Sequence, residues 1–159
     1  MHCTVLAFAS PPRPLCVQCG KPDEQGNILI PKLSYPSAEQ LSYDGVYLLN
    51  CATVMYLLIC PDVSAEVLQS LFGVPQLGQD DERLTLQPRD NEFSQCVCNI
   101  VNQIRLRSPI YQHVEVVVRG QAGAEPVMKY LVEDKSKGQM SYVEFLCLIH
   151  KKIQQKFVQ

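Results

Sequence analysis

The stretch VYLLNCATVMYLLIC, residues 46–60, decides the fold class of this chain. Its second half, TVMYLLIC (53–60), is a continuous apolar run, which is typical of a strand buried on both faces of a sheet. Its first half, VYLLN (46–50), follows a turn signal at Asp44-Gly45, and the short spacing between the two runs predicts a β-hairpin. Because a strand buried on both faces needs helices on both sides, the sequence predicts an α/β (α+β) domain with a small mixed sheet sandwiched between helices.

The segments around this hairpin supply further strands and shorter helices. Residues 4–9 predict a first strand, and VEVVV (114–118) predicts a β-branched strand later in the chain. Ser64 is suited to cap a helix that Gly73 ends. A short helix is expected over residues 125–133, after two glycines.

Two longer helices are also expected. Asp90 or Asn91 caps the first, and Ser108 with the following proline ends it. Ser141 and Glu144 form a capping box at the start of the second, which we expect to pack on the sheet with the helix before it. The apolar stripes are Phe93, Val97, Ile100, Val101 and Ile104 in the first helix, and Phe145, Leu146, Ile149 and Ile153 in the second.

Length and composition indicate one ordinary domain. The chain has 159 residues, of which 47 % are hydrophobic, so a sizeable core can form. We expect residues 1–120 to form the sheet domain, with a proline- and glycine-rich variable loop at 10–27, and residues 121–159 to form a helical segment that completes it.

Charge and cysteine content exclude several classes of protein. The formal net charge is −2, so no basic field is available to recruit nucleic acid or anionic lipid. No apolar run reaches the roughly 18 residues of a membrane span, and the amino terminus does not have the pattern of a signal peptide. Eight cysteines without a signal peptide favour a reducing, cytosolic setting over a disulfide framework.

The segment CVQCG (16–20) raises the question of zinc or redox chemistry. A structural zinc site needs four ligands, but His2 and Cys3 lie far away across a proline-rich loop. Cys96 and Cys98 lie two apart on a predicted helix, so they face in different directions. A redox dithiol needs a helix after its first cysteine, and Gly20 and a proline follow instead. We therefore expect loop cysteines, with no metal and no cofactor.

Other catalytic patterns are missing from the sequence. His2, His113 and His150 are far apart, and none forms an i, i+4 pair with another ligand. The acidic groups at 80–82 and 133–134 are typical of solvated charges. Nucleophile-elbow, dinucleotide-binding and phosphate-loop motifs do not occur. The sequence therefore predicts a protein that is not an enzyme.

The carboxyl-terminal sequence LVEDKSKGQMSYVEFLCLIHKKIQQ (131–155) is the most specific motif of the chain. It resembles the carboxyl terminus of the cargo-selecting adaptor subunit of the COPII inner coat. The stretches LSYDGVYLLNCATVMYLLIC (41–60), VLQSLFGV (67–74) and RDNEFSQCVCNIVNQIRLRSPIY (89–111) resemble the same family, so the likeness covers about residues 28–157. The residues that carry the carboxyl-terminal motif are Leu131, Glu133, Asp134, Ser141, Tyr142, Glu144, Phe145 and Leu146.

The resemblance implies a gelsolin-like domain and a non-catalytic role in a vesicle coat for transport from the endoplasmic reticulum to the Golgi. It implies a cytoplasmic protein that is peripheral on endoplasmic reticulum exit sites and on COPII vesicles. It also implies as partners the sister subunit of the inner coat, contacted through domains outside residues 1–159, and cargo receptors or cargo tails.

Two alternatives follow from relatives of this domain type. A calcium- or actin-binding gelsolin-type module would use Asp44 and Glu92, although a calcium site needs at least six oxygens. A GTPase activator would use an arginine, and Arg105, Arg107 and Arg119 are available. Nothing in the sequence around these residues indicates a calcium site or a catalytic arginine.

Overall fold

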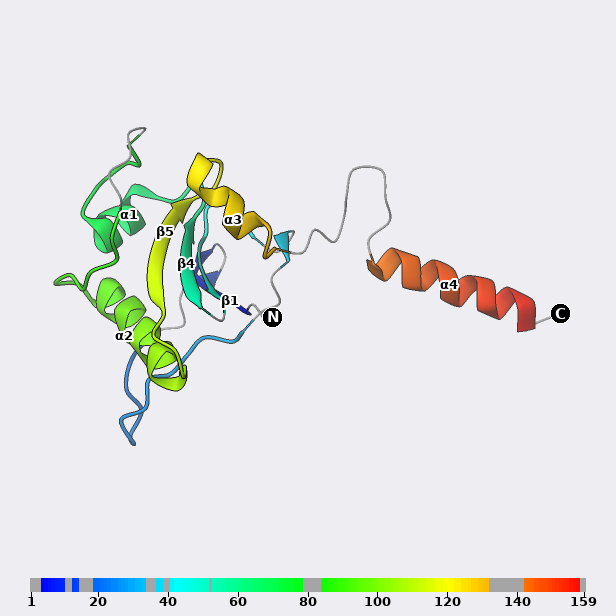
Figure 1. Cartoon of the computed structure of the whole chain (residues 1–159), viewed down its shortest axis with the longest axis horizontal. Coiled ribbons are helices and arrows are strands. Elements are labelled where there is room, and N and C mark those ends of the chain that lie inside the picture. Colours follow the sequence, from blue (N-terminus) through cyan, green and yellow to red (C-terminus); the bar gives the residue numbers. More distant parts are fainter. Residues whose placement is uncertain are drawn as a thin grey trace.

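The structure, a computed structural model, describes residues 4–10, 13–14, 19–33, 37–38, 41–51, 53–78, 84–131 and 142–157. Its centre is a five-stranded sheet with the order β2-β1-β3-β4-β5 (Figure 1). The strands are β1 (Thr4–Ser10), β2 (Arg13–Pro14), β3 (Val46–Cys51), β4 (Val54–Ile59) and β5 (His113–Val118).

The expected hairpin is confirmed as the centre of this sheet. β3 and β4 pair antiparallel from Val46↔Ile59 to Cys51↔Val54. β1 pairs antiparallel with β3, and β5 pairs parallel with β4. The sheet is therefore mixed, as the sequence predicts.

Every residue of β4 is buried, because helices cover both faces of the sheet. Figure 1 shows α2 on one side of the sheet and α3 on the other. Leu57 and Leu58 point to opposite faces, and both are fully buried. Burying such a side chain stabilises the fold by roughly 1.5–3 kcal/mol, which is why this strand lacks polar residues.

The helix α1 (Ala65–Phe72) begins and ends as its sequence predicts. The Ser64 side chain accepts a hydrogen bond from the Val67 amide, and Gly73 ends the helix with a left-handed φ of 74°. Arg89, from the segment before the next helix, donates hydrogen bonds to the carbonyls of Leu71 and Phe72. These bonds satisfy two carbonyls that a helix end leaves unpaired.

The long helix α2 (Glu92–Arg107) uses Asn91 as its cap. The Asn91 side chain accepts from the Ser94 amide at 2.8 Å and donates to the Ser70 carbonyl at 2.8 Å, so the cap also ties α2 to α1. Its five predicted apolar positions face the sheet, and Val97, Ile100 and Val101 are almost completely buried.

The helix that follows β5 is shorter than the sequence predicts. A 3-10 helix, η2 (Ala122–Ala124), leads into α3 (Glu125–Met128), in place of one helix over 125–133. Val127 and Leu131 are buried against the sheet face opposite α2. Tyr130 adds an aromatic contact with Tyr56 of β4, with ring centroids 6.1 Å apart.

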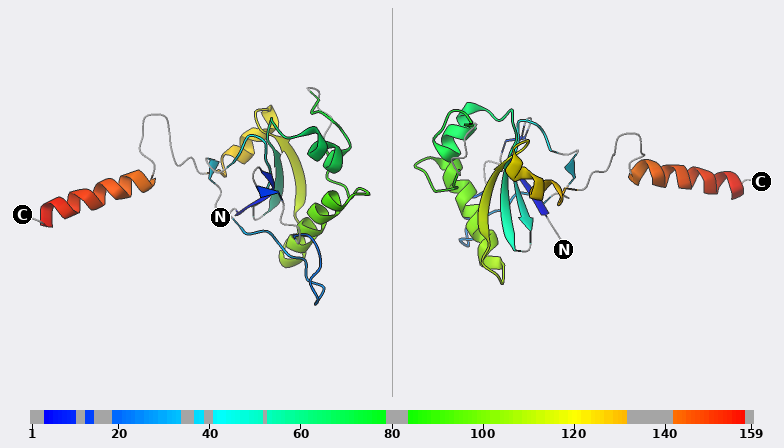
Figure 2. Two further views of the ribbon diagram at one scale, coloured as in Figure 1. Left: turned by 180° about the vertical axis from the view of Figure 1, so that it is seen from behind. Right: turned by 45° about the horizontal axis from the view of Figure 1, so that its top comes forward.

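The final helix, α4 (Tyr142–Phe157), differs from the sequence expectation in its packing. It stands apart from the sheet body in each view of Figures 1 and 2. The four residues of its predicted apolar stripe are exposed, with Phe145 at 49 % and Ile153 at 48 %. The helix forms where the sequence predicts it, but the described residues contain no surface that covers its stripe. None of the described helices is both long and apolar enough to cross a bilayer.

Removal of residues 132–159 is therefore expected to leave a folded sheet body. The exposed stripe of α4 contributes little burial to this chain, whereas Leu131, which the truncation keeps, is buried. We expect a cooperative thermal transition at a midpoint within error of the intact chain. Circular dichroism at 222 nm during heating checks this, and a molten product would show that α4 stabilises the body.

Candidate functional site

The residues of the carboxyl-terminal motif are not gathered in one site. Leu131 is buried at the end of the sheet body, whereas Glu144, Phe145 and Leu146 are exposed on α4. Tyr142 begins α4. Glu133, Asp134 and Ser141 lie outside the described residues, and so does the Ser141 half of the capping box. A shared role for the motif stays a prediction.

Cys19, the second cysteine of CVQCG, begins a small hairpin and does not lie in an open loop. Residues 16–18 lie outside the described part of the chain, but the Gly20 amide donates to the Leu29 carbonyl at 2.8 Å, and Pro22 bridges Ile28. At the tip, the Asp23 carboxylate accepts from the amides of Gln25 and Asn27. These bonds lower the pKa of Asp23, the Asn27 amide contributing most.

This hairpin, residues 19–29, is held against α2. The Asn99 side chain donates to the Gly20 carbonyl at 3.0 Å, and Cys19 is buried in the core. Lys21 pairs with Glu92 at 2.5 Å between Nζ and Oε1. The hydrogen bond and the charge of Glu92 raise the pKa of Lys21. The hydrogen bond and the charge of Lys21 lower the pKa of Glu92. Because both side chains are exposed, this ion pair is a weak tether, and the buried contacts at Cys19 and Gly20 hold the hairpin.

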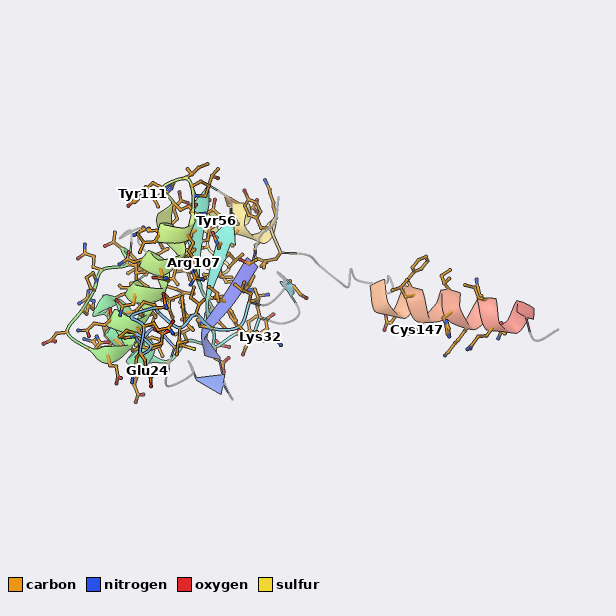
Figure 3. The ribbon with its side chains drawn as sticks, turned by 90° about the horizontal axis from the view of Figure 1, so that it is seen from below. Glu24, Lys32, Tyr56, Arg107, Tyr111 and Cys147 are labelled. Atoms are coloured by element: carbon orange, nitrogen blue, oxygen red, sulfur yellow. The ribbon has the colours of Figure 1, made fainter. Side chains whose placement is uncertain are left out.

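The cysteines of the described residues are buried packing groups in most cases. Burial raises the pKa of Cys60, Cys96 and Cys98, which disfavours the thiolate that metal binding or redox chemistry requires. Cys147 is exposed on α4, away from the other labelled side chains (Figure 3). Within the described ranges, no three His, Cys, Asp or Glu side chains are placed to hold a metal ion. His2, Cys3 and Cys16 lie outside those ranges.

The candidate calcium residues are occupied by other partners. Asp44 accepts a hydrogen bond from the Ser42 hydroxyl beside the start of β3. Glu92 is paired with Lys21 at the start of α2. The structure therefore does not bring these two carboxylates into a common oxygen cage.

Two of the candidate histidines lie within the described residues, and they lie on different elements. His113 contacts Glu115 at 2.8 Å on an exposed part of β5, and His150 is exposed on α4. The acidic residues 80–82 and 133–134 lie outside the described residues.

Two of the three candidate arginines, Arg119 and Arg105, have structural contacts. Arg119 lies over the Tyr43 ring, 4.8 Å from its centroid, and its interaction with Cys60 offsets part of the burial that raises the pKa of that thiol. Arg105 donates from Nε to the Gln112 carbonyl at 2.8 Å and lies over the Tyr111 ring at 5.2 Å. Arg107 ends α2 beside the exposed Leu106.

A cavity of about 270 Å³ lies between α2 and β5. Arg105, Asn102 and Cys98 line its α2 wall, and Val114 contributes from β5. The segment that leads into α2 closes another side through Thr85, Leu86 and Pro88. Polar and apolar side chains both line this cavity.

Sequence comparison relates the chain to known transport proteins. No protein-family model matches the chain. Protein transport protein SEC24 C of Arabidopsis thaliana is 32 % identical over 134 residues, which cover 84 % of this chain and 12 % of that protein. Protein transport protein Sec24C of Homo sapiens is 36 % identical over 121 residues, covering 75 % of this chain and 11 % of that protein.

Structural comparison agrees with the sequence. The crystal structure of the human COPII-coat protein Sec24c matches with a TM-score of 0.66 at 26 % identity, and the match covers 98 % of this chain. The chain is a homologue of the Sec24 proteins. This confirms the resemblance and the fold class stated from the sequence. The match covers 20 % of the Sec24c chain, so the chain corresponds to a small part of its Sec24 relatives.

One structurally important residue of this Sec24 homologue gave no clear sequence signal. Gln112 is 2 % exposed and donates from Nε2 to the Asn50 side chain at 2.9 Å and to the Cys51 carbonyl at 2.7 Å. It thereby joins the start of β5 to the end of β3. A glutamine between a turn and a strand is ordinary in sequence, and its burial depends on contacts about 60 residues away.

Proposed function

We propose that this chain is a non-catalytic module of a COPII cargo adaptor that acts in protein transport from the endoplasmic reticulum to the Golgi. The observation that carries the proposal is the match to the human COPII-coat protein Sec24c over 98 % of the chain. Relatives that are named as protein transport proteins support it at 32–36 % identity. This homology favours the adaptor over a calcium- or actin-binding gelsolin-type module.

Partners and location follow from that role. The protein is expected to be cytoplasmic and to join endoplasmic reticulum exit sites as a peripheral coat component. Its partners would be the sister subunit of the inner coat and cargo receptors or cargo tails. Because the matched relatives extend well beyond this segment, we expect the contact with the sister subunit to lie mainly in parts of the protein outside residues 1–159.

Affinity purification of the protein from its own cells tests this function. A tag placed at the native gene should recover the sister subunit of the inner coat. Residues 1–159 expressed alone in the same cells provide the matched control, and they should recover little of it. Recovery of actin, or of no coat subunit, by the protein expressed from its gene would contradict the proposal.

A further inference from the structure

β5 leaves one edge of the sheet without a partner strand in the described structure. It ends the strand order, and it bonds β4 on its inner side. The Arg119 amide just beyond β5 donates to the Ile59 carbonyl at 2.8 Å, which fixes the direction of the backbone groups. Because these groups alternate along a strand, those of Val114 and Val116 face outward. No hydrogen bond in the described part of the chain uses them.

The cavity between α2 and β5 is a second feature that a ligand at this edge can contact. Val114 lines it from the strand, and Arg105 lines it from the helix. The Arg105 guanidinium donates from Nε to the Gln112 carbonyl and from Nη1 to the Asn102 side chain at 3.4 Å, and no carboxylate pairs with it among the described residues. Its remaining donors suit a carboxylate placed in or over the cavity.

An exposed apolar and basic surface continues from this cavity. Leu106 is 81 % exposed, Ile110 is 54 % exposed and Tyr111 is 76 % exposed. Figure 3 shows Tyr111 at the rim of the body. Arg107 lies in the same stretch and has no carboxylate partner in the described ion pairs. Tyrosine and arginine beside aliphatic side chains are the composition of interface centres.

These features together select the class of ligand. Free backbone donors and acceptors on an edge pair with an extended strand and not with a helix. Arg105 and Arg107 favour an acidic ligand. We propose that the outer edge of β5 binds an extended acidic peptide segment of a partner protein, which adds a strand and places a carboxylate on Arg105.

This site goes beyond the coat-module function and does not depend on it, because purified chain suffices for the test. The probe is a short fluorescein-labelled peptide of alternating threonine and valine with aspartates at one end. Versions with the aspartates at the amino or the carboxyl end cover both strand directions. The matched control peptide carries asparagines instead. Fluorescence anisotropy should show binding of one acidic peptide, and about tenfold weaker binding of its asparagine counterpart.

Two pairs of variants test separately the backbone pairing at the edge of β5 and the charge of Arg105. Val116→Pro removes an outward amide, while Val116→Ala shortens the same side chain and keeps the amide. Arg105→Gln removes the charge and can still donate to the Gln112 carbonyl, and Lys129→Gln removes an exposed charge at the C-cap of α3. The proline and Arg105→Gln variants should bind about tenfold more weakly than their controls.

Three results would overturn the site. The first is no binding of either acidic peptide. The second is equal binding by Val116→Pro and Val116→Ala at unchanged melting temperatures, or unchanged binding by Arg105→Gln. The third is a dimer, seen by light scattering, that Val116→Pro abolishes, which would assign the edge to a second copy of the chain.

Discussion

Gly20→Ala is expected to lower the free energy of unfolding by about 2–5 kcal/mol. Gly20 has a φ of +81°, which costs an alanine about 1–2 kcal/mol. A Cβ at this position would lie 2.5 Å from the Cys96 Cβ and 2.6 Å from the Cys96 carbonyl oxygen of α2. Because the clash involves helix backbone, the hairpin of residues 19–29 must move away from α2, which adds about 1–3 kcal/mol.

Gly26→Ala supplies the matched control for this prediction. Gly26 lies at the tip of the same hairpin with the same φ of +81°, but nothing lies within 4 Å of its added Cβ. It should lose only the conformational term of about 1–2 kcal/mol. Urea unfolding of both variants measures the difference, which reports the contact between hairpin and helix. Equal losses in the two variants would show that the hairpin does not pack on α2.

Gly20 illustrates what local sequence could and could not predict. The CVQCG stretch was examined for zinc and redox chemistry because cysteine spacing is a local signal. The structural importance of the stretch comes from Cys96 and Asn99, which lie far along the chain on α2. No local pattern could pair them with a glycine. Cys19 is buried in the core as a result, in place of lying in an open loop.

The elements themselves were predictable because their signals are local. Ser64, Gly73 and Asn91 act at the helix ends where their side chains or backbone predict. The apolar run of β4 predicted helices on both faces of the sheet, and the structure shows them. A capped helix can thus be located from about four residues at each end.

The packing of α4 could not be predicted in the same way. The apolar stripe with Phe145 and Ile149 fixes which face of the helix avoids water, and its period identifies a helix. It carries no information about which surface covers that face. The described residues leave the stripe exposed, so the sequence located the helix but not its packing.

Gln112→Met is expected to lower the free energy of unfolding by about 2–3 kcal/mol. Methionine has a similar size and flexibility but donates no hydrogen bond, so the Asn50 side chain and the buried Cys51 carbonyl would lose their donor. Each unpaired buried acceptor costs about 1–3 kcal/mol, and the better transfer of methionine into the core offsets part of that loss. The loss should appear as a lower urea midpoint at an unchanged slope. Gln121→Met, the same change at an exposed position, should have little effect.

Gln112→Glu tests the same contacts through pH. The carboxyl group can donate to the Cys51 carbonyl only while protonated, and burial among acceptors should raise its pKa above the usual glutamate value. A raised folded-state pKa contributes stability that is present below the unfolded-state pKa and is lost as pH rises through the folded-state pKa. The glutamate variant should therefore approach the parent chain in stability at acidic pH and fall below it toward neutral pH, while Gln112→Met stays below it by a constant amount. Parallel stability curves for the parent chain and the glutamate variant would show that the side chain of residue 112 is hydrated in solution and does not join β5 to β3.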